Sequence, residues 1–189
     1  MKSIKNNISN KIVINKSEFI CEIIKIKDVN KISEEIEKIK IKYKDATHYC
    51  YAYIIGDKRK SSDDGEPGGT AGVPMMETLS KYDLNYVLCV VIRYFGGIKL
   101  GAGGLIRAYR KAVNDCLENA NFSTLENGYY IELETNYDKQ KDLEYILKDN
   151  YKKEYNEKVL YKIECTKDVK EILEKNYQFN LIREKVIEI

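Results

Sequence analysis

The chain is organised around Ser61–Asn121, which reads SSDDGEPGGTAGVPMMETL (Ser61–Leu79), then the apolar run YVLCVVIRYF (Tyr86–Phe95), then GGIKLGAGGLIRAYRKAV (Gly96–Val113). Most of the glycines and both prolines of the chain lie in this stretch. Glycine is the usual residue where the backbone needs a positive φ or must approach another group closely. An acidic glycine-rich loop, a buried strand and a glycine-rich turn before a basic helix together indicate a composite functional site.

Composition places the chain among folded proteins of one or two domains. It has 189 residues, of which 43% are hydrophobic and 33% are charged, the balance of an ordinary folded domain and not of a disordered one. Residues 1–124 carry 20 Lys and Arg against 15 Asp and Glu, whereas residues 125–189 carry 12 against 15. The basic first part is a weak indication of an anionic partner.

The cysteines are odd in number, widely spaced and set in apolar runs, which argues against a disulfide framework and against a metal-binding CxxC pair. They are Cys21, Cys50, Cys89, Cys116 and Cys165. We interpret them as small buried hydrophobic residues in a reducing compartment. No signal pattern begins the chain, and no apolar run reaches the ~20 residues that a bilayer requires. We therefore expect a cytoplasmic protein with no membrane association and no cofactor.

Period-two and helical patterns predict the elements before the central stretch. Lys11–Asn15 and Phe19–Ile26 are typical of a hairpin with its turn at Lys16–Ser17, and Val29–Tyr43 is typical of an amphipathic helix capped by Asp28. The predicted strand His48–Ile55 follows, and its two faces alternate. His48 is the only histidine. A hydrogen-bonded histidine at a strand end is the commoner case, and a catalytic acid–base group is the alternative.

The predicted loop Asp57–Val73 is long, and long loops in compact domains are often functional. It carries three close carboxylates, which could bind a divalent cation. Capping of nearby helix ends and bonding to loop amides is the favoured use. The candidate loop site comprises Asp63, Asp64, Gly65, Glu66 and Thr70, and its carboxylates Asp63, Asp64 and Glu66 are weak metal candidates.

Tyr86–Ile92 is predicted to be a strand buried on both faces, after a short helix over Met75–Lys81. The strand delivers Arg93 at its end. A charged residue at the end of a buried strand needs a partner. Either one of the loop carboxylates or a bound anion could serve, and the sequence leaves both open.

The turn Gly96–Gly104 precedes a predicted helix over Leu105–Asn121. Consecutive amides in a glycine turn at a helix start favour anion binding, although neither the Walker motif nor the dinucleotide motif is present. The helix places its cations on one exposed side, where they could contact phosphates or form a solvated face. The candidate anion-binding residues are Arg93, Gly96, Gly97, Lys99, Gly101, Gly103, Gly104, Arg107, Arg110 and Lys111.

Glycine becomes scarce after Asn121, and strand and helix patterns alternate. The predicted order is strand Tyr129–Thr135, helix Tyr137–Asn150, strand Lys153–Tyr155, strand Val159–Cys165, helix Asp168–Lys175 and strand Leu181–Ile189. This βαββαβ order is that of a ferredoxin-like domain. We expect an α+β protein with domains at 1–124 and 125–189.

The central stretch resembles the IMPACT/YigZ family. The resemblance rests on SDDGEPGGTAG (Ser62–Gly72) and VVIRYFGGIKLGAGGLIRAY (Val90–Tyr109), with NKSEFI (Asn15–Ile20) and DATHYCYAY (Asp45–Tyr53) in the same order. It implies a first domain of the left-handed βαβ type shared by a small-subunit ribosomal protein and domain IV of elongation factor G. The tail is similar, in pattern more than in residues, to the smaller C-terminal domain of the bacterial branch and to domain V of that factor.

The resemblance and the charge together favour a translation-associated regulatory protein that binds RNA or the ribosome through its first domain. Eukaryotic relatives regulate translation through a further domain that we do not expect here. One alternative is a metal- or phosphate-handling hydrolase using the acidic and glycine-rich loops with His48 as the acid–base group. Another is a protein–protein adaptor. We consider enzymatic activity less favoured than binding. A protein partner is possible, and we expect no specificity for DNA.

Overall fold

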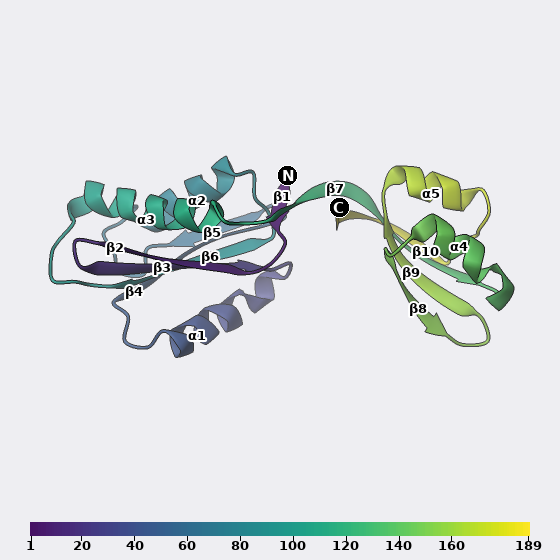
Figure 1. The fold of residues 1–189 in the computed structure, drawn as a ribbon, viewed down its shortest axis with the longest axis horizontal. Helices are drawn as coiled ribbons and strands as arrows, with labels where there is room; N and C mark the ends of the chain where they lie inside the picture. Colours follow the sequence, from purple (N-terminus) through teal and green to yellow (C-terminus); the bar gives the residue numbers. More distant parts are fainter. The chain divides into compact units, whose positions relative to one another are not determined.

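The structure, a computed structural model, describes residues 1–189. The chain divides into two units, Met1–Ser123 and Thr124–Ile189, and has a two-domain α+β fold (Figure 1). No helix combines the length and the apolar character needed to cross a membrane.

The first unit is built on one antiparallel sheet. Across the sheet the strands are β2 (Ile8–Ile14), β3 (Ser17–Lys25), β6 (Val87–Tyr94), β4 (His48–Ile55) and β5 (Lys58–Ser62). The central strand β6 is buried at every position from Val87 to Arg93. This confirms that the apolar run before the glycine turn is a strand covered on both faces.

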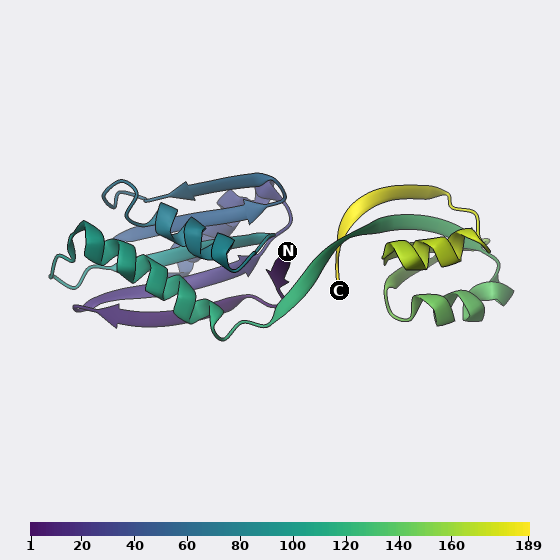
Figure 2. The same ribbon diagram turned by 90° about the horizontal axis from the view of Figure 1, so that it is seen from above.

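Helices cover both faces of this sheet. Helix α1 (Ile32–Lys42) lies on one face, and α2 (Gly72–Lys81) and α3 (Gly101–Leu117) lie side by side on the other (Figures 1 and 2). The alternation of β4 is as predicted. Cys50, Ala52 and Ile54 join the core under α2 and α3, and the intervening tyrosines face the α1 side.

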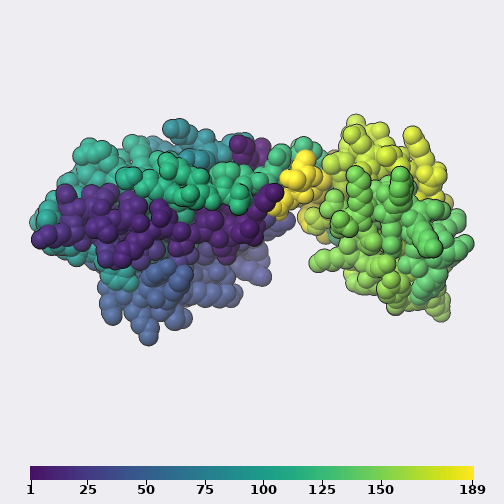
Figure 3. Space-filling model, in the orientation of Figure 1, coloured from purple at the N-terminus to yellow at the C-terminus, as the bar shows by residue number.

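A βαβ connection surrounds the central strand. β3 and β4 both pair antiparallel with β6, so they run parallel to each other. A 3-10 turn (Val29–Lys31) and α1 connect them. The side chain of Asp28 accepts a hydrogen bond from the Asn30 amide at 2.9 Å, which confirms the predicted cap. The space-filling view shows β2 and β3 (purple) at the front of this unit, with α3 above and α1 below (Figure 3).

Part of the predicted loop Asp57–Val73 is a strand, so that prediction was wrong at its start. β5 pairs with β4 through a two-residue turn, Gly56–Asp57, in which Gly56 has φ +59°. Gly-Asp between two runs is a hairpin signal, but the polar sequence of β5 (KRKSS) hides its strand character. The edge of β4 supplies the hydrogen bonds that form it. A further short strand, β1 (Lys2–Ile4), was also not predicted.

Two boundaries differ from the sequence-based expectation. Helix α3 begins at Gly101 and not at Leu105, so three glycines of the expected turn occupy its first turn. The first three residues of this turn are exposed, and Gly101 has φ +68°, a conformation that glycine adopts readily. The β2–β3 turn is Asn15–Lys16, one residue earlier than expected. Both residues have positive φ, as a type I′ turn requires.

The second unit has the βαββαβ order that the sequence predicts. Its elements are β7 (Phe122–Thr135, which begins in the first unit), the 3-10 turn Tyr137–Lys139, α4 (Gln140–Leu147), β8 (Tyr151–Tyr155), β9 (Val159–Cys165), α5 (Lys167–Glu174) and β10 (Leu181–Glu188). The strand order across the sheet is β10-β7-β9-β8, and all neighbours are antiparallel. A separate apolar core that includes Ile131, Leu143 and Leu173 joins the sheet to both helices.

Gly96 allows β6 to end directly against the β2–β3 turn. A Cβ atom at this position would lie 2.0 Å from both the carbonyl carbon and the oxygen of Lys16. No side chain can occupy that space, so the close approach itself requires glycine. At Gly97, in contrast, a Cβ atom would meet nothing within 4 Å, and glycine is favoured there by its φ of +85°.

Replacing Gly96 should therefore destabilise the first unit strongly. We expect Gly96→Ala to lower the free energy of unfolding by about 3 kcal/mol, at the upper end for overpacking, because the turn must move away. Gly68→Ala is the matched control, since a Cβ atom there meets nothing and its φ is not positive. It should change stability by less than about 1 kcal/mol. Urea unfolding followed by circular dichroism measures both, and equal effects would contradict the steric explanation.

Candidate functional site

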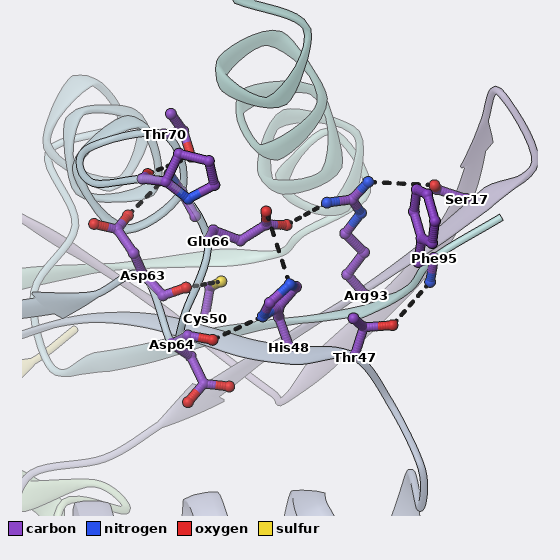
Figure 4. A network of polar contacts seen from close by, with 12 residues as sticks. Ser17, Thr47, His48, Cys50, Asp63, Asp64, Glu66, Thr70, Arg93 and Phe95 are labelled. Atoms are coloured by element: carbon purple, nitrogen blue, oxygen red, sulfur yellow. Dashed lines mark hydrogen bonds and ion pairs between the residues drawn. The ribbon is translucent and has the colours of Figure 1, made fainter. Parts of the chain in front are cut away.

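The candidate residues meet at one end of the first sheet. β6 ends and β4 begins at this end, because the antiparallel register pairs Arg93 with His48. β3 also begins here, and its Phe19 pairs with Arg93 from the other side. The loop between β5 and α2 folds over the same place (Figure 4).

The centre of the site is a buried ion pair between Glu66 and Arg93. Arg93 Nη1 donates to Glu66 Oε1 at 2.6 Å, and the two side chains are only 6% and 3% exposed. Tyr109 on α3 donates its hydroxyl to the same oxygen at 2.8 Å. Of the two partners left open for Arg93, the structure therefore shows the carboxylate. The pair links the acidic loop to the central strand and to α3.

The guanidinium group of Arg93 lies between two aromatic rings. Its central carbon is 5.4 Å from the ring centroid of Phe19 and 5.4 Å from that of Phe95. Ser17 Oγ, 3.5 Å from Arg93 Nη2, also accepts a hydrogen bond from the Gly96 amide at 3.1 Å. Arg93 and Ser17 thus connect the acidic loop to the glycine turn, so the two segments form one site.

His48 is held by the acidic loop. Its Nδ1 lies 2.7 Å from the Asp64 carbonyl oxygen, and because a carbonyl only accepts, Nδ1 carries the proton. Nε2 faces Glu66 Oε2 at 3.9 Å, too long for a direct hydrogen bond. The backbone of Gly65 lies against the ring. The contacts of His48 are those of the hydrogen-bonded histidine that was the commoner expectation.

Asp63 organises the loop through its carboxylate. It accepts hydrogen bonds from the amides of Gly69, Ala71 and Gly72 at 2.8, 3.0 and 2.8 Å. Burial alone would raise the pKa of Asp63, but these three bonds outweigh it and lower that pKa. The favoured use of the acidic residues, bonding to loop amides and to the start of α2, is confirmed for Asp63.

Each of the weak metal candidates has a protein partner. Asp64 accepts from the Tyr49 amide at 2.6 Å, and Asp63 and Glu66 are engaged as described above. No group of three or more histidine, cysteine, aspartate or glutamate side chains has a metal-binding arrangement. The three carboxylates are close in sequence, but the fold directs each to a different set of donors. Thr70 also acts locally, because its hydroxyl donates to the Pro67 carbonyl at 2.6 Å.

Neither Cys50 nor Tyr109 has the properties of a nucleophile. Cys50 Sγ donates to the Asp63 carbonyl at 2.9 Å, and burial raises the pKa of this thiol to about 12. Burial and the neighbouring Cys50 also raise the pKa of Tyr109. Both groups stay protonated at neutral pH, as a nucleophile would not. All the cysteines are free and buried, which confirms their interpretation as core residues.

The candidate cations fall into two groups. Arg110 pairs with Glu77, and Lys111 pairs with Asp115 at 2.8 Å. Lys99 and Arg107 are exposed and make no ion pair. They flank the first turn of α3, which has no side-chain cap and no acidic residue. With Arg93, three of the five predicted cations are thus paired with carboxylates, and Lys99 and Arg107 remain without an ion pair near the start of the helix.

Several site residues were not predicted. Ser17, Thr47 and Phe95 lie inside the blocks that carry the family resemblance, but their contacts come from strands that are remote in sequence and could not be predicted from it. Thr47 Oγ1 accepts from the Phe95 amide at 3.0 Å. The burial of Tyr109 could have been predicted from the sequence, since Tyr109 follows Leu105 by one helical turn and therefore shares its buried face.

Comparisons with known proteins agree on one family. Residues 15–117 match the Impact N-terminal domain. The chain is 51% identical over 120 residues to the IMPACT family member YvyE of Bacillus subtilis, covering 62% of this chain and 55% of that protein. It is 40% identical over 109 residues to YigZ of Escherichia coli, covering 55% of this chain and 53% of that one. The matched region therefore spans about half the length of these curated relatives.

Solved structures extend the similarity to both units. A structure described as "Crystal structure of an hypothetical protein" superposes with a TM-score of 0.66 and 27% identity over 94% of this chain and 95% of that chain. A two-domain translational regulator, Yih1, superposes with a TM-score of only 0.37 and 23% identity over 61% of this chain and 46% of that one. The second similarity is too low to transfer fold or function.

The bonds to Asp63 predict a stability difference that depends on pH. Asp63→Asn should lower the free energy of unfolding at pH 7 by about 1–2 kcal/mol, because an amide has one acceptor oxygen and no charge. The pKa is lowered by folding, so this stabilisation is present above the unfolded-state pKa of about 3.9 and is lost as the pH falls through the folded value. The difference from the wild type should therefore shrink below pH ~4 in urea unfolding. Asp57→Asn, an exposed control, should show no such trend.

The buried pair predicts strong coupling between Glu66 and Arg93. Glu66→Gln should destabilise the protein by about 3–5 kcal/mol, because it leaves Arg93 buried without a carboxylate. The double variant Glu66→Gln/Arg93→Met should regain much of the lost stability, because it buries no unpaired charge. The exposed pair is the control, and Glu77→Gln should cost less than about 1 kcal/mol. Additive effects of Glu66→Gln and Arg93→Met would refute the coupling.

Proposed function

Since the chain belongs to the IMPACT family, we propose that it is a translation-associated regulatory protein whose first unit binds RNA or the ribosome. The support from fold is what the family resemblance implies, a first unit similar to a ribosomal-protein domain and to domain IV of elongation factor G. The observation that carries the proposal is the free positive charge at the start of α3.

This positive charge has three sources in and around the first turn of α3. Lys99 and Arg107 are exposed and unpaired, and the amides of the first turn have no capping side chain. A helix start carries a partial positive charge, which favours phosphate. Arg107 lies back over this turn, because a Cβ atom added at Gly103 would be 3.5 Å from its Nη1. The Arg107 guanidinium group is therefore close to the backbone of this first turn.

The sheet edge adds further basic residues. Lys58, Arg59 and Lys60 on β5 are exposed and form no ion pair. Contacts of this kind attract a phosphate backbone without reading its sequence. The groups that a hydrolase would need, the loop carboxylates and Cys50, are engaged by protein donors and acceptors. The geometry therefore favours binding over catalysis.

Neutralising the two free cations should weaken RNA binding and its salt dependence. For Lys99→Ala/Arg107→Ala we expect the slope of log affinity against log salt to fall by about 1.4, or about 0.7 per phosphate contact on a single strand. Fluorescence anisotropy with a labelled single-stranded RNA, and sedimentation with Bacillus subtilis ribosomes, measure the two targets.

The control removes the same amount of positive charge, from two paired cations of α3. Arg110→Ala/Lys111→Ala should change the slope much less, because Glu77 and Asp115 already neutralise these cations. Equal losses in both double variants would show that only net charge matters and would refute the assigned site. Absence of wild-type binding to both RNA and ribosomes would refute the proposed function.

A further inference from the structure

Phe95 is an aromatic residue held out at the surface beside the buried site. It directly follows β6, and 46% of its surface is exposed. Beneath it lies the guanidinium group of Arg93, which in turn lies over the fully buried ring of Phe19. Figure 4 shows the Phe95 ring beside Arg93, away from the loop side where Glu66 and His48 lie. The exposed ring is thus backed by a cation and by the core.

Hydrogen bonds to two side chains hold the backbone at Phe95. Its amide donates to Thr47 Oγ1 at 3.0 Å, and the next amide, of Gly96, donates to Ser17 Oγ at 3.1 Å. Arg93 cannot move away, because Glu66 holds it at 2.6 Å. An aromatic ring that is already ordered loses little conformational freedom when a partner stacks on it.

Free positive charge follows Phe95 along the chain. Lys99 is four residues further on, so its Cα lies within at most about 14 Å of that of Phe95. Helix α3 starts two residues after Lys99 with no side-chain cap, and Arg107 lies in its second turn. Exposed aromatic rings combined with unpaired cations are the means by which many proteins hold single-stranded nucleic acid, with bases on the rings and phosphates on the cations.

We propose that Phe95 is a stacking platform for an unpaired base of single-stranded RNA, and that Lys99 and Arg107 contact the adjacent phosphates. The inference rests on the proposed function and names the RNA element that the site takes. Stacking uses the face of the ring and every base has such a face, so little sequence preference is expected. The charge favours RNA over an apolar peptide as the occupant.

The absence of tryptophan from the chain makes a direct test possible. Phe95→Trp introduces the only tryptophan and keeps a flat ring at the platform. Its emission should be quenched when a single-stranded oligouridylate is added, and not when an abasic ribose-phosphate chain of equal length is added. Ile98→Trp, at the other exposed apolar residue of the loop (43% exposed), is the matched reporter and should be quenched less. If the abasic chain quenched the emission of Phe95→Trp as much as the oligouridylate does, the proposal that a base stacks on this ring would be overturned.

Affinity measurements separate stacking from general apolar contact. Phe95→Leu keeps an apolar side chain without a flat ring and should lower affinity for the oligouridylate about tenfold. Its salt slope should stay unchanged, because stacking releases no counterions. Ile98→Ala should bind within about twofold of the wild type. Far-UV circular dichroism checks that both variants are folded.

The outcomes distinguish this inference from the proposed function. If the wild type binds RNA and Phe95→Leu binds equally well, the platform is refuted while RNA binding stands. If Phe95→Leu loses binding to ribosomes but not to free RNA, the ring serves a protein, and the inference is likewise overturned. If the wild type binds neither RNA nor ribosomes, the proposed function itself fails.

Discussion

The buried ion pair between Glu66 and Arg93 is the interaction on which the rest of the first unit depends. Two charges removed from water are tolerated only when each has a close, well-oriented partner. Glu66 comes from the acidic loop and Arg93 from the end of the central strand, and Tyr109 on α3 bonds to the same carboxylate oxygen. The need to pair these charges therefore holds a loop, a strand and a helix in one arrangement.

Further hydrogen bonds around the Glu66–Arg93 pair hold the acidic loop and the backbone at the end of β6. Asp63 accepts hydrogen bonds from three amides of the loop and so orders its backbone. Ser17 and Thr47 bind the backbone where β6 ends, and they set the direction in which Phe95 and the glycine turn leave the sheet. The buried charges of Glu66 and Arg93 are paired with each other, whereas the exposed cations Lys99 and Arg107 near the start of α3 form no ion pair. The proposed binding of a polyanion rests on this division.

The sequence predicted elements wherever apolar periodicity is strong. The buried strand β6, the two faces of β4 and the βαββαβ order of the second unit all follow from that pattern. The prediction from apolar periodicity failed at β5. The residues of this strand are polar, and it forms on the open edge of β4. The apolar pattern also placed the start of α3 too late, because glycine is a poor helix former and the first buried residue of the helix is Leu105.

The sequence by itself determined the composition of the site. The acidic glycine-rich loop, Arg93 at the end of a buried strand, and the basic helix after a glycine turn can all be read from it. Only the tertiary structure decided that Arg93 pairs with Glu66 and not with an anion, that Lys99 and Arg107 stay free, and that Phe95 stands exposed. The physical reason is distance. Charges pair and rings stack only within a few ångströms, and the fold alone brings together groups that lie tens of residues apart in the chain.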